Sequence, residues 1–130
     1  MTSTLYQQIQ ELYDASLAAL LAVEKAMTPG NTFGDVFEAH ARSLEASGLT
    51  RHRLNACGYS VGARFTPSWM ESQMFYQDSP EPIAPDMTLF AHMIIMDSDT
   101  ETAMTLGRTY LTTDAAPRPL SRYNLDLIVK

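Results

Sequence analysis

The segment that most constrains the fold is Met87–Met96, a ten-residue apolar run that only Thr88 and His92 interrupt. A run of this length and composition predicts a central strand that is buried on both faces. The turn residues Asp97–Thr100 follow, and then a second strand-like segment, Thr102–Thr113. We therefore expect an antiparallel hairpin at the centre of a sheet.

Two amphipathic helices are predicted before the strands. The residues that share one helical face in the first are Leu5, Ile9, Leu12, Ser16, Leu20, Val23 and Met27. Pro29 ends this helix at Met27, and Thr32 with Asp35 forms a capping box for the second, which Gly48 ends. Helices followed by antiparallel strands indicate an α+β domain, with two N-terminal helices packed on an antiparallel sheet.

Between the helices and the hairpin, Leu54–Val61 predicts a short buried strand that contains Gly58. We expect this strand to run into an irregular loop that presents Arg64, Trp69 and Glu71. The loop should continue over residues 70–86, because this stretch contains Pro80, Pro82 and Pro85. Near the end of the chain, Leu125–Val129 predicts a final short strand.

Composition narrows the classes of function. The 130 residues suit one domain, and a formal net charge of −6 argues against binding to nucleic acid or to an anionic membrane. The single cysteine, Cys57, excludes a disulfide framework and favours a cytoplasmic, reducing compartment. Neither a signal peptide nor a membrane span is expected, since no apolar stretch is long enough.

A few polar residues are candidates for a binding site. His92 lies within the apolar run, so it either faces a pocket or is a core histidine that needs a hydrogen-bond partner. Arg108 lies beside Gly107 and either holds an anion or carboxylate or faces solvent at an edge. Arg64 and Glu71 could form no more than a surface ion pair. His40, on the apolar face of the second helix, is expected to be a packed residue.

No sequence pattern predicts a catalytic nucleophile, a metal or a cofactor. Cys57 has no histidine near it in sequence and is expected to behave as a small buried apolar residue. Asp97, Asp99 and Glu101 are acidic, but they lie in the predicted hairpin turn without the pattern of a calcium-binding loop.

Five segments, in this order, carry a resemblance to a known family. They are Met27–Phe37, Gly58–Gly62, Pro85–Phe90, Gly107–Thr113 and Leu125–Val129. In them the chain resembles the C-terminal half of the catalytic domain of the pita-bread superfamily, which holds Xaa-Pro dipeptidases, methionine aminopeptidases and creatinase. The sequence Gly-Tyr-Ser-Val-Gly, with Pro-Ser-Trp after it, is most similar to the ectoine-hydrolase and creatinase-like branch.

The resemblance also implies positions for the family's metal ligands. The metal-binding histidine falls on Tyr59, the first metal-binding glutamate on His92 and the second on Gly107. The two metal-binding aspartates belong to the N-terminal half, which the resemblance does not cover. It therefore implies that this chain holds no metal and no cofactor, as in creatinase, where polar side chains around the pocket support carbon–nitrogen hydrolysis.

By this analogy, and with the loop residues added, a candidate substrate-binding set can be named. It consists of Tyr59, Arg64, Trp69, Glu71, His92 and Arg108. No catalytic residue is identified, because the general base is expected from the absent half.

Residues 1–130 are thus expected to form a single domain, a truncated C-terminal half of a creatinase- or aminopeptidase-like catalytic domain. The resemblance implies a hydrolase-like domain without metal ligands that acts on or binds a small amide-containing or zwitterionic solute such as ectoine, and that is incomplete as a catalyst alone. The alternatives are a non-catalytic relative that binds a ligand or a partner and, less favoured, a metallopeptidase. A lone half would expose a sheet edge, so a homodimer is expected.

Overall fold

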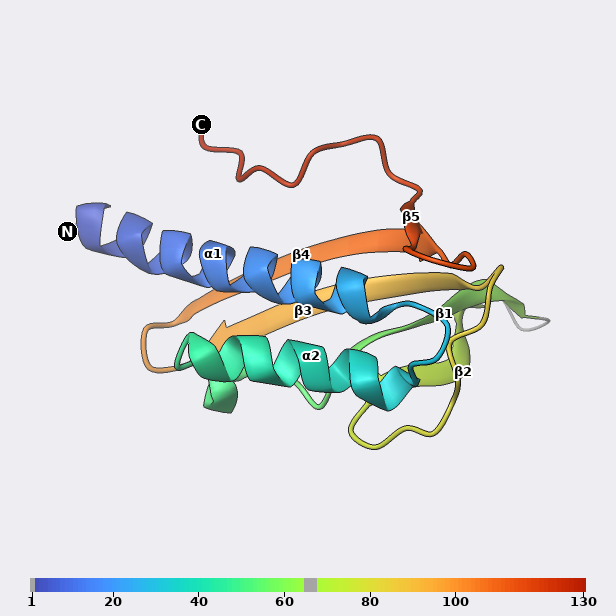
Figure 1. The fold of residues 1–130 in the computed structure, drawn as a ribbon. Coiled ribbons are helices and arrows are strands. Elements are labelled where there is room, and N and C mark those ends of the chain that lie inside the picture. The colour runs from blue at the N-terminus through green and yellow to red at the C-terminus, as the bar shows by residue number, and fades with distance from the viewer. Residues whose placement is uncertain (1, 65–67) are drawn as a thin grey trace.

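The computed structural model describes residues 2–64 and 68–130. Its elements are α1 (Thr2–Ala26), α2 (Phe33–Ala46), the 3-10 helix η1 (Thr50–His52), β1 (Ala56–Arg64), β2 (Ser68–Tyr76), β3 (Thr88–Asp97), β4 (Thr102–Leu111) and β5 (Arg118–Pro119). The strands form one antiparallel sheet in the order β2-β1-β3-β4-β5. Both long helices cover the same face of this sheet (Figure 1), which confirms the predicted α+β class.

The hairpin of β3 and β4 forms the centre of the domain, as predicted. Its register is unbroken from the pair Thr88–Leu111 to the pair Asp97–Thr102. The odd-numbered residues of β3, from Leu89 to Ile95, are fully buried under the helices. The even-numbered residues from Thr88 to Ile94 are only half-buried, because none of the described elements covers that side of the sheet. The expectation that β3 is buried on both faces therefore holds for one face only.

The two helices begin and end close to the predicted residues. Buried residues of α1 include Leu12, Ala15, Ser16, Ala19, Leu20 and Val23. The capping box of α2 is present, since the Thr32 hydroxyl accepts from the Asp35 N–H and the Asp35 carboxylate accepts from the Thr32 N–H. Gly48 follows α2 with a φ of 71°, a left-handed conformation that glycine adopts without strain.

The expected loop after β1 is partly wrong, because residues 68–76 form the edge strand β2. This segment contains the aromatic residues Trp69, Phe75 and Tyr76, a residue type that favours extended backbone. Pro80, Pro82 and Pro85 all come after β2 has ended, so they do not interfere with its pairing. The loop prediction holds for the segment between β2 and β3.

A bulge in β1 explains the requirement for Gly58. The β1–β2 register shifts between the pairs Ala56–Tyr76 and Tyr59–Met74, and Gly58 adopts a φ of 147°. A Cβ atom at this position would lie 2.1 Å from the Phe90 carbonyl oxygen. The sharp local twist is therefore available only to a residue without a side chain.

The predicted strand at Leu125–Val129 is not observed. Among the described residues, the one strand pairing beyond β4 is that of the two-residue β5, and the chain then runs back along α1 toward the N-terminus (Figure 1). The Tyr13 hydroxyl donates to the Leu125 carbonyl at 2.6 Å and holds this tail on the helix. A segment that leaves the sheet edge to follow a helix has no strand to pair with, despite its apolar alternation.

The buried residues include several polar groups, among them those of His40, Cys57 and Tyr110. His40 packs its ring against Phe37 with centroids 5.4 Å apart, as expected for a packed histidine. Burial raises the pKa of the Cys57 thiol far above its usual range. Tyr110 donates its hydroxyl proton to the Glu24 carboxylate of α1 at 2.7 Å and so fixes α1 on β4.

None of the described helices combines the length and apolarity needed to cross a lipid bilayer.

Candidate functional site

The uncovered side of the sheet, which we call the open face, carries a row of ring side chains. Trp69 donates its indole N–H to the Tyr59 hydroxyl at 3.1 Å. The Tyr59 and Phe90 rings meet edge to face with centroids 5.4 Å apart, and the Phe90 and His92 rings follow at 5.0 Å. Three strands thus contribute to one continuous aromatic row across the open face.

A pocket of about 370 Å³ lies beside this row. The residues that line it are Leu54, Asn55, Ala56, Gly58, Tyr59, Met74, His92 and Ile94. Most of these side chains are apolar, and the polar groups come from one imidazole, one phenol and one carboxamide. An apolar hollow with a few convergent polar groups is the usual form of a small-molecule site.

His92 therefore lies at the pocket rather than in the core, which was one of the two interpretations of its place in the sequence. Partial burial lowers the pKa of His92 below its ordinary value, which favours the neutral imidazole. A neutral imidazole donates a hydrogen bond from one nitrogen and accepts one at the other. His92 is thus equipped to bind an amide or hydroxyl group rather than to carry a charge.

The glycine opposite His92 shapes the same face. Gly107 is the register partner of His92 on β4, and a Cβ atom there would lie 2.6 Å from Cζ of Phe90. The Phe90 ring consequently lies over a position that has no side chain. This arrangement lets the aromatic row stay close to the sheet.

The other predicted residues do not join this group. Arg108 pairs with Ala91, which faces the helices, and its guanidinium lies beside the Tyr110 hydroxyl on the covered face. Glu71 accepts a hydrogen bond from the buried Ser60 hydroxyl at 2.5 Å and also faces the covered side. The Arg64 side chain lies outside the part of the chain that is described. Tyr59, Trp69 and His92 are thus the predicted residues that the open face brings together.

Several residues of the pocket were not singled out from the sequence. Ile94 of the pocket and Phe90 of the neighbouring aromatic row lie two positions on either side of His92, so strand alternation could have placed them on the same face. Asn55 and Met74 come from other parts of the chain, and Met74 belongs to the strand that was expected to be a loop. The pairing of β1 with β2 places Met74 beside Tyr59.

The open face also shows whether the three positions that the resemblance assigned to metal ligands could bind a metal. Tyr59, His92 and Gly107 do lie on the same face, through the pairings of β1 and β4 with β3. Of these three, only the His92 imidazole is an ordinary metal ligand, and none is a carboxylate. Among the described residues, the one group of three or more possible metal-binding side chains lies elsewhere, at His52, Asp97 and Asp99.

Comparison with known structures identifies the fold. The dipeptidase PepE from Mycobacterium ulcerans superposes with a TM-score of 0.83 and 18% identity, over 94% of this chain and 31% of that one. The prolidase from Pyrococcus horikoshii OT3 gives a TM-score of 0.83 and 17% identity, over 94% of this chain and 34% of that one. The chain thus spans about a third of the length of these structures.

Another match is the N-terminal domain of the FACT complex subunit SPT16 from chickpea, Cicer arietinum. Its TM-score is 0.73 and its identity 14%, over 84% of this chain and 27% of that one. A comparison with curated proteins gave no significant match. Residues 1–114 match metallopeptidase family M24, which is most of the chain. The pita-bread-like fold and this match together show that the chain belongs to metallopeptidase family M24.

Proposed function

We propose that this creatinase- and Xaa-Pro-peptidase-like domain binds a small amide-containing or zwitterionic solute, of which ectoine is an example, on the open face of its sheet. We also propose that it is incomplete as a catalyst alone. The observation that carries this proposal is the pocket beside His92, whose lining contains an imidazole, a phenol and a carboxamide but no carboxylate. Such a lining favours recognition of an amide over activation of water by a metal.

The polar groups of the pocket match those of an amide. Neutral His92 offers one donor and one acceptor, and the Asn55 carboxamide offers two N–H donors and an accepting oxygen. Tyr59 already accepts the Trp69 N–H, so its own hydroxyl proton is available to a ligand oxygen. The side chains of Met74 and Ile94 would contact the carbon skeleton of the solute.

Metal-dependent peptide hydrolysis is the less favoured function. The family's name implies a metal, yet a phenol, one imidazole and a glycine do not fit a hydrolytic two-metal site, which needs several carboxylate or imidazole ligands. We therefore assign no reaction step to a metal on the open face. Hydrolysis of an Xaa-Pro dipeptide by the purified chain, dependent on added manganese or cobalt, would restore this alternative.

A non-catalytic role in binding a partner is the second candidate. The matched SPT16 domain is named as a subunit of a complex and not as a peptidase. The edge strand β2 also exposes three large side chains, Trp69, Met70 and Tyr76. A strand at the edge of a sheet that exposes large side chains is suited to pair with another chain.

We propose a second copy of this chain as that partner, which would complete the sheet at β2. Light scattering should then give twice the mass of one chain. Met70→Lys should give the mass of a single chain, because a charge on an edge strand opposes edge pairing. A wild-type monomer at micromolar concentration would contradict the homodimer and leave ligand binding by one chain as a separate question.

Ligand binding can be tested by calorimetry with ectoine, creatine and an Xaa-Pro dipeptide as probes. His92→Ala should weaken binding of the recognised probe at least tenfold, since a buried polar partner of the ligand is lost. Arg108→Ala is the matched control, because Arg108 lies on the opposite face of the sheet, and it should change binding less than twofold. The proposal fails if none of the probes binds, or if the two variants weaken binding equally.

A further inference from the structure

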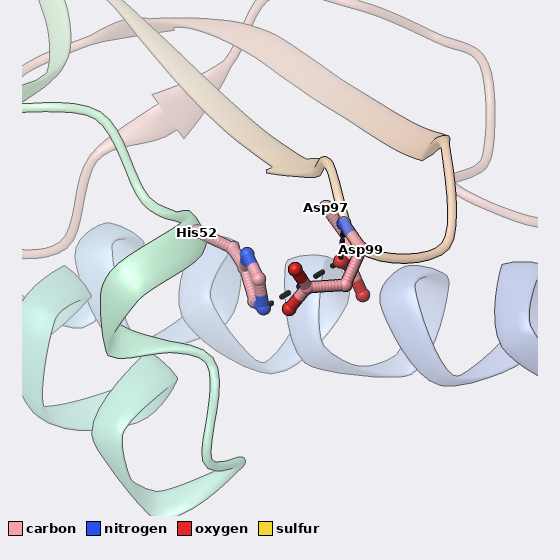
Figure 2. A group of neighbouring side chains, drawn as sticks. All are labelled: His52, Asp97 and Asp99. Carbon is pink, nitrogen blue, oxygen red and sulfur yellow. Dashed lines mark hydrogen bonds and ion pairs between the residues drawn. The ribbon is translucent and has the colours of Figure 1, made fainter.

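A second group of polar side chains lies at the C-terminal end of β3, and none of its members lines the pocket. His52 is the last residue of η1, Asp97 is the last residue of β3, and Asp99 lies in the turn before β4. An isolated bridge between Arg53 and Ile95 brings the η1 segment against the end of β3, although the two are distant in sequence. Figure 2 shows the His52 imidazole directed toward the two carboxylates.

The distances in this group suit ligands of one ion. His52 Nε2 lies 3.7 Å from Asp97 Oδ1, which is too long for a hydrogen bond. Metal–nitrogen and metal–oxygen bonds are about 2.0–2.2 Å, so two donors on one tetrahedral ion lie roughly 3.4 Å apart. One ligand atom from each of the three residues lies within 4.8 Å of the others. A small rotation of the exposed Asp99 side chain would bring its carboxylate to the separation expected between ligands of one ion.

Burial makes this group unlike an ordinary surface cluster. The side chains of His52 and Asp97 are only 10% and 15% exposed. The imidazole is therefore nine-tenths buried, with its Nε2 aimed at carboxylates to which it is not hydrogen-bonded. Asp97 Oδ1 accepts the backbone N–H groups of Asp99 and Thr100, at 2.9 Å and 3.3 Å. A cation between the imidazole and the carboxylates would satisfy His52 Nε2 as well.

The surroundings are acidic and accessible. Asp97 also lines a cleft of about 500 Å³ against α1, where Glu11 and Asp14 add two more carboxylates. The competing cation is Arg51, which pairs with Asp99. Both side chains of that pair are more than half exposed, so the pair is weak and Asp99 can be released.

We propose that His52, Asp97 and Asp99 bind one divalent transition-metal ion of the zinc class. A ligand set of one imidazole and two carboxylates suits such an ion better than calcium or magnesium, which take oxygen ligands. Because Asp99 is exposed, one coordination position of the bound ion would remain open to solvent. The ion would link η1 to the β3–β4 hairpin, and this site is separate from the pocket at His92.

Calorimetric titration of the full chain with Zn²⁺ or Co²⁺ tests this site. We expect one ion per chain, and at least tenfold weaker binding in His52→Ala. Asp99→Asn should also weaken binding, and because this substitution is isosteric and exposed it keeps the fold intact. Arg51→Ala should tighten binding, because it removes the competitor of the metal for Asp99.

Two controls separate this site from others. Asp114→Asn alters an exposed acidic residue elsewhere, and His92→Ala alters the histidine of the open face; neither should change the affinity. The chain has only three histidines, so imidazole nitrogen chemical shifts can assign the ligand directly, and His52 Nε2 alone should shift with Zn²⁺. Absence of binding, or binding that His52→Ala leaves unchanged, would overturn the proposal, as would loss of binding in His92→Ala alone.

Discussion

The ring of Phe90 occupies the space that a side chain on Gly107 would need, with Cζ only 2.6 Å from an ideal Cβ position. Phe90 is itself held between Tyr59 and His92, at centroid distances of 5.4 Å and 5.0 Å. A change at Gly107 on β4 is therefore transmitted through one ring to the pocket residues of β1 and β3.

Gly107→Ala should destabilise the fold by about 1–3 kcal/mol, because the Phe90 ring must leave its rotamer to make room. Urea denaturation measures this loss. The matched control is Thr105→Ala, an exposed change on the same face of β4 without a steric conflict. If the two variants are equally stable, Phe90 is free to move and does not link β4 to the pocket.

Gly58→Ala should be more damaging, with a loss of about 3 kcal/mol or more. The obstacle here is backbone, the Phe90 carbonyl oxygen at 2.1 Å, and a φ of 147° is strained for alanine. The same denaturation series should therefore rank Gly58→Ala below Gly107→Ala in stability. The reverse order would mean that the bulge in β1 can relax.

His40 should make the stability of the domain depend on pH. Burial, with a smaller effect from the charge of Arg53, lowers its pKa from 6.5 to about 4. The unfolded chain then binds a proton that the folded chain does not, so stability is complete above pH 6.5 and falls as the pH drops toward 4. Between pH 7 and 4.5 the expected loss is about 2–3 kcal/mol.

Replacement of His40 isolates this contribution. His40→Leu should lose less free energy of unfolding than the wild type over the same pH interval, because the carboxylates that also titrate there are common to both proteins. If the free energy of unfolding changes with pH equally in the two proteins, His40 takes up a proton in the folded state as readily as in the unfolded state.

Tyr13→Phe should release the C-terminal tail without unfolding the domain. The hydrogen bond from Tyr13 to the Leu125 carbonyl holds the tail, and a single bond of this kind is worth about 1 kcal/mol. Trypsin should cleave after the exposed Arg122 faster in this variant, while the melting temperature changes little. Tyr6→Phe, an exposed change on the same helix, is the control and should leave the cleavage rate unaltered.

Local chemistry made much of the fold predictable from the sequence. The capping box at Thr32 and the end of α2 at Gly48 depend on neighbouring residues, and the hairpin follows from two long strand-like segments joined by a short turn. The strand β2 could not be predicted as readily, because its flanking prolines and glycines are also typical of loops. Leu125–Val129 has the pattern of a strand but lacks a partner, and only the tertiary structure decides that.

The candidate site was predictable in part for a related reason. His92 stands out because it interrupts an apolar run, and its alternation partners follow from strand geometry. Whether Arg108 shares its face depends on the register of β4 against β3. That register pairs His92 with Gly107 and so turns Arg108 to the opposite side. The grouping of His52 with Asp97 and Asp99 depends on a bridge between distant segments, which no local pattern encodes.

The burial of Cys57 also has an experimental consequence. The chain has one thiol, and it lies fully enclosed between β1 and the helices, with burial holding its pKa well above the usual range. A thiol-specific reagent can therefore react only when the helical layer separates from the sheet. The rate of this reaction would report how often the interior opens, without any probe having to be introduced.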